Sequence, residues 1–281
     1  MKHTSVHRFM GKPGYEKVIT ADNSNLKNLG FGRILLEAQD KLNFEVSGEE
    51  IAVVLQNGDF MISVEWDGKM AFEGLKGTRS SVFDEKPFAI YLPPGSKVSL
   101  ESKNGMEARV FSAPCEEGNA PFFCRPEDVE EGVPGDLNFK RKFRFVFGPP
   151  GEHNDQITKK LIVGESVSVP GGWIGFPAHR HDFNTEKEYP LDEIFSFKLN
   201  GPEGAYVLQH SYGVEEKWDE VNVIDGDDYA VALAEGYHTS LAAPGCTEYL
   251  LWGLAGKEKI YKIRFDERFK TLGDAEALYK F

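Results

Sequence analysis

The stretch GFPAHRHD, residues 175–182, places His179 and His181 one residue apart in a chain that has only seven histidines. Alternate side chains of a β-strand point to the same face, so within a strand both imidazoles would lie on one side of a sheet. Such a pair is a chelate for a divalent metal ion. Its interpretation depends on whether the chain around it forms strands.

Runs of apolar, β-branched and aromatic residues recur along the chain, separated by turn signals such as NGD (57–59) and DGDD (225–228). The runs of strand length are IAVVLQ (51–56), FMISVEW (60–66), FAIYL (88–92), KVSL (97–100), ARVFS (108–112), FRFVF (143–147), EIFSFKL (193–199), AYVLQHSY (205–212), YAVALA (229–234) and EYLLWGLA (248–255). Helical periodicity is best at 273–281, where Ala275, Leu278 and Tyr279 would share a face. The sequence therefore predicts an all-β protein.

The charge of the chain argues against nucleic-acid and membrane partners. Its formal net charge is −13 and its pI is about 5.1, so it repels polyphosphate and anionic lipid. The densest basic run, Lys140-Arg141-Lys142 with Arg144, is interpreted as a solvated strand face.

The three cysteines, Cys115, Cys124 and Cys246, form no CxxC pair and leave an odd thiol. This count argues against a secreted disulfide framework and favours the cytoplasm. No apolar signal region and no run of 18 apolar residues is present, so we expect neither export nor membrane spanning.

The chain divides into two halves that resemble each other in the order of their strands and turns. Because residues 114–150 are rich in proline, glycine and acidic side chains, we expect a linker there, between an N-terminal domain (1–113) and a C-terminal domain (151–281). In the two glycine corners, PGSK and EGYH, Lys97 aligns with His238. Since an ammonium is a poor metal ligand, only the C-terminal domain could complete a histidine site.

Two further ligands follow the His179–His181 pair along the chain. Glu193 opens the strand EIFSF 12 positions after His181, and His238 follows the glycine corner 45 positions later. Three imidazoles and one carboxylate suit zinc, manganese, iron or nickel, with zinc preferred here. Four other carboxylates are weaker candidates, because they fall in a loop or on the wrong face of the strand: Asp182, Glu186, Glu188 and Asp192.

The stretches FPAHRHD, YPLDEIFSFKL, AYVLQHSY and VALAEGYHTSLAAPG together resemble the 5-deoxy-glucuronate isomerase branch of the bicupins. This family holds the inositol-catabolic isomerase and its relative 4-deoxy-threo-hexosulose-uronate ketol-isomerase. KLIVGES, GTRSSVF and YLPPGSKV extend the likeness over nearly the whole chain. The resemblance implies two jelly-roll β-barrels and a metal held by His179, His181, Glu193 and His238. It also implies an aldose–ketose isomerisation of a deoxy-uronate, which makes the chain an intramolecular oxidoreductase.

A uronate needs a cation for its carboxylate. Lys259 is the preferred candidate, with Arg180 and Arg264 as alternatives, and Gln209 could face the site. The chain departs from the family at Ala234, where a proline is usual, at Gln209-His210, where Gln-Arg is usual, and at Lys259, where the family has an arginine. It also lacks the family's His-x-Trp pattern near the end. The metal ligands are thus retained while the residues expected around the substrate differ.

Two other functions stay open. One is a different metal cupin enzyme such as an oxygenase, since the same ligand set can hold iron and activate oxygen. The other is a sugar-binding bicupin without catalysis. The sequence does not single out a catalytic base, and uncovered sheet edges allow a homo-oligomer without fixing its size.

Overall fold

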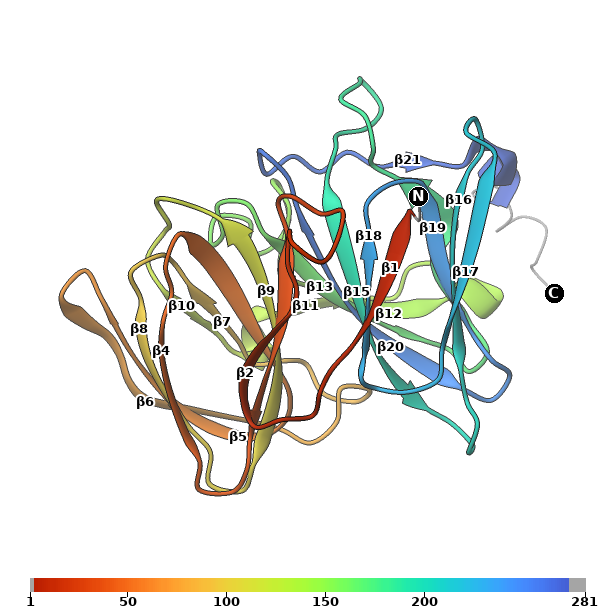
Figure 1. Cartoon of the computed structure of the whole chain (residues 1–281). Coiled ribbons are helices and arrows are strands. Elements are labelled where there is room, and N and C mark those ends of the chain that lie inside the picture. The colour runs from red at the N-terminus through yellow and green to blue at the C-terminus, as the bar shows by residue number, and fades with distance from the viewer. Residues whose placement is uncertain (1–2, 273–281) are drawn as a thin grey trace.

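The structure is a computed structural model that describes residues 3–272. It contains two groups of strands that lie side by side, with the N-terminal half on one side and the C-terminal half on the other (Figure 1). The prediction of an all-β protein with two barrels is confirmed. The helix expected at 273–281 lies outside the described residues.

The first half is a nine-stranded sheet that curls into a barrel. Its strands are β2 (Gly14–Ile19), β3 (Gly30–Leu36), β4 (Lys41–Glu45), β5 (Glu49–Trp66), β6 (Lys69–Arg79), β7 (Ala89–Leu92), β8 (Lys97–Glu101), β9 (Met106–Pro114) and β10 (Phe122–Cys124). The main path runs β10-β7-β5-β9-β3-β2, while β6 pairs with β5, and β8 pairs with both β5 and β4. All of these pairings are antiparallel.

The turn expected at residues 57–59 does not form, because β5 continues through these residues from Glu49 to Trp66. The first part of β5 pairs with β7 and β9, and its last part pairs with β8 on the other side of the barrel. Gly58 lies where the strand bends, with a φ of +90°. A Cβ there would lie 2.1 Å from the carbonyl oxygen of Gly105. The glycine therefore serves a close approach of two backbones within one long strand.

The second half consists of two sheets. The seven-stranded sheet has the order β1-β18-β15-β20-β13-β12-β11 and the five-stranded sheet has the order β17-β16-β19-β14-β21. The strands are β1 (Thr4–Arg8), β11 (Glu130–Gly132), β12 (Arg141–Phe147), β13 (Ile162–Ser168), β14 (Trp173–Arg180), β15 (Asp192–Asn200), β16 (Val207–Gly213), β17 (Trp218–Ile224), β18 (Tyr229–Leu233), β19 (Tyr237–Ala242), β20 (Thr247–Ala255) and β21 (Arg264–Phe265).

The helical content of the described residues is three short 3-10 helices. They are η1 (Pro126–Asp128), η2 (Leu137–Phe139) and η3 (Glu267–Leu272). Among residues 3–272 no helix has the length and apolar character needed to cross a membrane. The three cysteines are buried and unpaired.

The two halves share a core. One cluster of buried side chains combines Ala52 and Phe111 of the first half with Val163 and Leu251 of the second. The first strand crosses over as well, since β1 pairs with β18 along its whole length and lies among the strands of the second half in Figure 1. Within 114–150, β10 pairs with β7, whereas β11 and β12 join the seven-stranded sheet. The domain boundaries at 113 and 150 stay a prediction.

The second barrel has its own core between its two sheets. Ile174 of the five-stranded sheet packs in the same cluster as Phe195 and Leu250 of the seven-stranded sheet. Strands β14 and β19 line one side of this interior and β15 lines the other. Side chains that point inward from these three strands can therefore meet at one point.

Candidate metal centre

His179 and His181 lie at the end of β14. Regular pairing between β14 and β19 is interrupted after Ile174 and resumes at His179, which lies opposite His238. His181 follows the last residue of the strand. The imidazole rings of His179 and His181 are 6.2 Å apart, and those of His179 and His238 are 4.7 Å apart, centroid to centroid. The spacing in the sequence thus brings both rings of the pair to the same side of the sheet.

The third imidazole is placed by the glycine corner that precedes β19. Gly236 has a φ of +94°, and a Cβ on it would lie 2.4 Å from Cζ2 of Trp218. Only glycine fits both the conformation and the space. Two residues later, Nδ1 of His238 donates a hydrogen bond of 2.9 Å to the carbonyl oxygen of Gly236. The corner therefore fixes the ring of His238 as well as the backbone.

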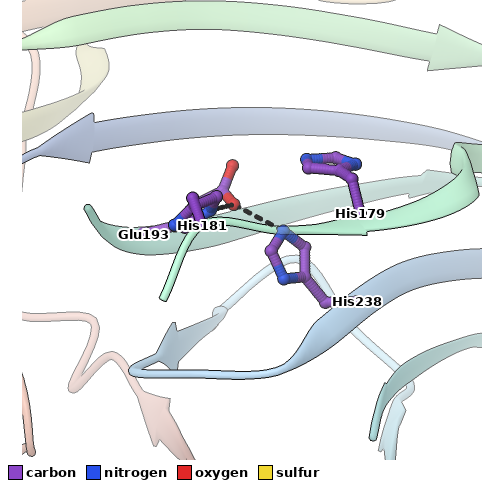
Figure 2. Close-up of side chains that lie close together, drawn as sticks. All are labelled: His179, His181, Glu193 and His238. Atoms are coloured by element: carbon purple, nitrogen blue, oxygen red, sulfur yellow. Dashed lines mark hydrogen bonds and ion pairs between the residues drawn. The ribbon is translucent and has the colours of Figure 1, made fainter. Parts of the chain in front are cut away.

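Glu193 reaches the three imidazoles from the opposite sheet, since it is the second residue of β15. Its Oε2 atom lies 3.0 Å from Nε2 of His181 and 2.7 Å from Nε2 of His238. One ligand atom from each of the four residues lies within 4.8 Å of the other three. Figure 2 shows the three rings and the carboxylate lying together. The four side chains predicted from the sequence converge on one point.

Hydrogen bonds to backbone carbonyl groups orient two of the imidazole rings in the cluster as in a metal site. Nδ1 of His181 donates to the carbonyl oxygen of Leu191 at 2.8 Å, as Nδ1 of His238 does to Gly236, so the Nε2 atoms of both rings point toward Glu193. Metal-bound histidines commonly use their second nitrogen in this way. Nε2 of His238 is buried and, in the described part of the chain, has no hydrogen-bond partner of acceptable geometry despite its short distance to Glu193. An unpartnered nitrogen inside a three-histidine, one-carboxylate cluster fits a divalent cation.

Burial and mutual interactions shift the pKa values of three of the four residues in the cluster. Burial lowers the pKa of His179 well below its usual value, and the neighbouring His238 lowers it further. Burial alone would raise the pKa of Glu193, but the imidazoles of His238 and His181 outweigh it and bring the pKa far below its usual value. His179 is therefore neutral and Glu193 is ionised near neutral pH, as ligands must be. Burial lowers the pKa of His181, but its hydrogen bond to Glu193 outweighs burial and raises it, so a metal ion would displace a proton from this ring.

A cavity in the interior of the second barrel opens onto the cluster. Its walls are mainly aromatic and aliphatic, with Phe143, Phe195 and Trp252 among them. Its polar lining consists of Arg141, Ser166, His179, Glu193 and Tyr261. An apolar cavity with a few converging polar groups is typical of a small-molecule site.

Arg180 does not line this cavity. Because it alternates with His179 and His181 along the chain, its side chain lies away from the cluster, where the guanidinium contacts Glu215 at 3.0 Å and Glu188 at 3.4 Å. Arg264, its neighbour in β21, lies 3.9 Å from the same Glu215. Both cations thus have acidic partners within the protein.

Lys259 and Gln209 are also absent from the cavity lining. Nζ of Lys259 donates to the carbonyl oxygen of Asp155 at 2.6 Å and to Oγ1 of Thr158 at 2.7 Å, and burial lowers its pKa to about 8. Gln209 is buried in β16, where its amide donates to Ser211 and accepts from Asn222. A role for Arg180, Lys259 or Gln209 in substrate binding stays a prediction.

The interpretation of residues 140–144 as a solvated strand face is wrong. Arg144 is 1% exposed and its Nη1 lies 2.6 Å from Oε1 of Glu165, while Nζ of Lys142 donates to the carbonyl oxygen of Phe83 in the first half. Arg141 shares the other face of β12 with Phe143, and both line the cavity. Both faces of β12 are covered by other parts of the protein, so its basic side chains do not form a solvated strand face.

Tyr261 is another residue of the cavity that the sequence did not indicate. It follows β20 in an irregular stretch and lines the cavity beside His179 and Glu193. Burial, together with the charge of Glu193, raises the pKa of its phenol. No motif in the sequence marks this tyrosine. By contrast, the alternation of Arg141 with Phe143 and Phe145 places this arginine on one face of a strand with two aromatic residues, although the sequence does not show which face is inside.

The fold and the site together define a class of protein. Two β-barrels in one chain, with a histidine and carboxylate centre inside the second barrel, are the features of a bicupin. The chain matches the KduI/IolB family over residues 6–272, and it belongs to that family.

Relatives of known name agree with this assignment. The chain is 25% identical over 246 residues to a 5-deoxy-glucuronate isomerase of Halalkalibacterium halodurans, covering 87% of each chain. It is 27% identical over 250 residues to a 5-deoxy-glucuronate isomerase of Geobacillus kaustophilus, covering 88% of this chain and 87% of the relative.

Solved structures support the same fold. An IolB-like protein from Salmonella typhimurium superposes with a TM-score of 0.85 at 23% identity, over 97% of this chain and all of the other. A mutant of Bacillus subtilis oxalate decarboxylase superposes with a TM-score of 0.61 at 10% identity, over 100% of this chain and 84% of the other. At these identities the likeness shows the fold alone.

Proposed function

We propose that this chain is a metal-dependent aldose–ketose isomerase that acts on a deoxy-uronate such as 5-deoxy-glucuronate, in inositol or carbohydrate breakdown. One observation carries the proposal: His179, His181, Glu193 and His238 converge at the wall of an interior cavity. The relatives named 5-deoxy-glucuronate isomerase supply the substrate class.

The four side chains would be the ligands of the metal. Zinc is our first choice because three imidazoles and one carboxylate suit a borderline cation, and manganese, iron and nickel are alternatives. The cavity reaches the centre at His179 and Glu193. A sugar bound in the cavity would therefore approach the cluster from the side of these two residues.

An aldose–ketose isomerisation moves a proton between C2 and C1 through an enediol. A bound divalent cation supplies Lewis-acid polarisation of the substrate oxygens. The chain itself contributes an apolar enclosure around the reacting carbons, in which Phe195 and Trp252 limit the access of water. In such surroundings, hydrogen bonds to the developing charge are stronger than in bulk water.

Tyr261 is the cavity residue best suited to move a proton at oxygen. Because its pKa is raised by burial and by the charge of Glu193, its phenol keeps its proton near neutral pH. The hydroxyl can therefore donate a hydrogen bond to a substrate oxygen as negative charge develops on it.

The three buried, unpaired cysteines fit a reducing compartment, so we place the protein in the cytoplasm. Its partner is the sugar acid, and homo-oligomerisation stays a prediction.

The function can be tested with 5-deoxy-glucuronate in deuterated water, followed by proton NMR. We expect the metal-loaded protein to convert the aldose to the ketose and to exchange the C2 proton with solvent. Removal of the metal, or His179→Ala, should abolish both signals while the variant keeps its strand content by circular dichroism. Elemental analysis of the same samples would identify the metal.

Two outcomes would contradict the proposal. Oxygen uptake by an iron-loaded sample, without isomerisation, would indicate an oxygenase. Saturable binding of the uronate by metal-loaded protein, with the C2 proton retained, would indicate a sugar-binding bicupin without catalysis.

A further inference from the structure

Arg141 lines the cavity that contains the metal-ligand cluster, at the start of β12. Within residues 3–272 its side chain makes one hydrogen bond, from Nη1 to the carbonyl oxygen of Phe139 at 3.2 Å. Among the described residues no carboxylate lies within ion-pair distance of this guanidinium. Since a guanidinium offers five donors, most of its hydrogen-bonding capacity is available to a ligand.

This situation is unusual in the chain, which has ten arginines. Eight of them pair with a carboxylate: Arg8, Arg33, Arg79, Arg109, Arg144, Arg180, Arg264 and Arg268. Of the other two, Arg125 is exposed, so its charge is open to solvent. Arg141 is partly buried against an apolar wall, where water cannot replace a missing anion as well.

The surroundings of Arg141 indicate that its guanidinium lacks an anionic partner. Burial lowers its pKa, and the phenol of Tyr261 only partly offsets this effect, but a guanidinium stays protonated at any physiological pH. It is the one permanent cation in the lining of the cavity as described for residues 3–272. Its charge also acts on the neighbouring His179, which places it close to the metal-ligand cluster. A ligand in this cavity therefore shares it with a guanidinium that has no carboxylate partner among the described residues.

We propose that Arg141 binds the carboxylate of the sugar acid and so restricts the site to anionic sugars. This inference rests on the proposed function, because it takes the cavity to be the substrate site. A carboxylate can accept two parallel N–H bonds from the planar guanidinium, an arrangement that lysine cannot reproduce. The apolar walls strengthen this pair relative to the same pair in water. A neutral sugar would leave the guanidinium buried and unpaired.

The test compares binding of D-glucuronate and D-glucose to the full-length, metal-loaded protein by titration calorimetry. The probes differ by a carboxylate in place of a hydroxymethyl group. We expect the protein to prefer glucuronate, and Arg141→Gln to reduce that preference by about 100-fold, as the loss of charge-assisted hydrogen bonds implies. Arg141→Lys should give an intermediate preference. The matched control is Arg125→Gln, which removes the other unpaired arginine and should change nothing.

The outcomes separate this inference from the proposed function. If Arg141→Gln and Arg141→Lys keep their metal and their fold and still prefer glucuronate as the unmodified protein does, the inference is wrong. It is also wrong if the unmodified protein does not distinguish the two sugars. Loss of the preference in a protein that isomerises no deoxy-uronate would support Arg141 and contradict the isomerase. Isomerisation by the unmodified protein, together with an unchanged preference in Arg141→Gln, would support the isomerase and contradict the role of Arg141.

Discussion

Oε2 of Glu193 lies 2.7 Å from Nε2 of His238, although the two residues come from different sheets of the second barrel. The carboxylate supplies the only negative charge of the four-residue cluster. It is thus the group that would offset part of the charge of a divalent cation there. Its position also means that a bound metal would link the two sheets.

We expect Glu193→Gln to weaken metal binding by at least about 100-fold, because changes to residues that merely support metal ligands already cost 10- to 100-fold. Competition with a chromophoric chelator measures this affinity. A chelator should also lower the melting temperature of the unmodified protein but not that of the variant, since a ligand of the folded state stabilises it. The matched control is Glu186→Gln in the exposed loop after His181. Equal metal affinity in the two variants would show that Glu193 is not a ligand.

Tyr261→Phe should lower kcat by about 100-fold, at the lower end of the range for proton transfer by a positioned side chain. The variant keeps the ring that lines the cavity and loses only the hydroxyl. Metal content should therefore stay unchanged, and KM should change little. Initial rates of ketose formation over a range of uronate concentrations measure both constants. Tyr206→Phe, at an exposed tyrosine, is the control. A full rate in Tyr261→Phe would remove this hydroxyl from the mechanism.

Much of the site was predictable from sequence because its signals are local. The spacing of His179 and His181 fixes a shared face, and Gly236 fixes the corner before His238. The role of Arg141 was not predictable in this way, because it depends on which face of β12 is inside the barrel. The same limit applies to Gly58, which signals a turn in isolation but lies within β5. In both cases distant strands decide the outcome.

Glu165 joins the two halves of the chain. Its buried carboxylate lies 2.8 Å from Nη2 of Arg79 in the first half and 2.6 Å from Nη1 of Arg144 in the second. The hydroxyl of Tyr249 donates to its other oxygen at 2.7 Å. Among the described residues, Glu165→Gln would leave the buried guanidinium of Arg79 without a counter-charge, while Arg144 would keep only its pair with the partly exposed Glu131.

We expect that substitution to lower the free energy of unfolding by roughly 3 to 5 kcal/mol, as for other broken buried ion pairs. Urea denaturation monitored by tryptophan fluorescence measures it. Glu267→Gln, which removes the exposed pair with Lys187, should change the free energy by less than about 1 kcal/mol. If the two variants are equally stable, the buried ion pairs of Glu165 do not contribute to the free energy of unfolding to the extent that their burial predicts.

Glu248 gives the protein a distinctive dependence of stability on pH. Its side chain is fully buried, and Oε2 has no hydrogen-bond partner among the residues that the structure describes, while Oε1 accepts a hydrogen bond from Ser240. Burial raises its pKa to about 8, and the hydrogen bond from Ser240 opposes this effect without overcoming it. Below pH 4.5 this carboxyl group is protonated in both the folded and the unfolded chain. Between that pH and about 8 only the folded chain retains the proton, so stability falls as pH rises.

Glu248→Gln resembles the protonated acid and cannot ionise. The free energy of unfolding of this variant should therefore rise relative to the unmodified protein as pH increases from 5 to 8, by up to about 1.4 kcal/mol per pH unit. Urea denaturation of both proteins at each pH measures the difference, in which the contributions of all other groups cancel. A difference that stays constant over this range would mean that Glu248 is ionised in the folded protein, and that a polar partner reaches Oε2. A difference that falls as pH rises would mean that folding lowers the pKa of Glu248, and would exclude a raised pKa.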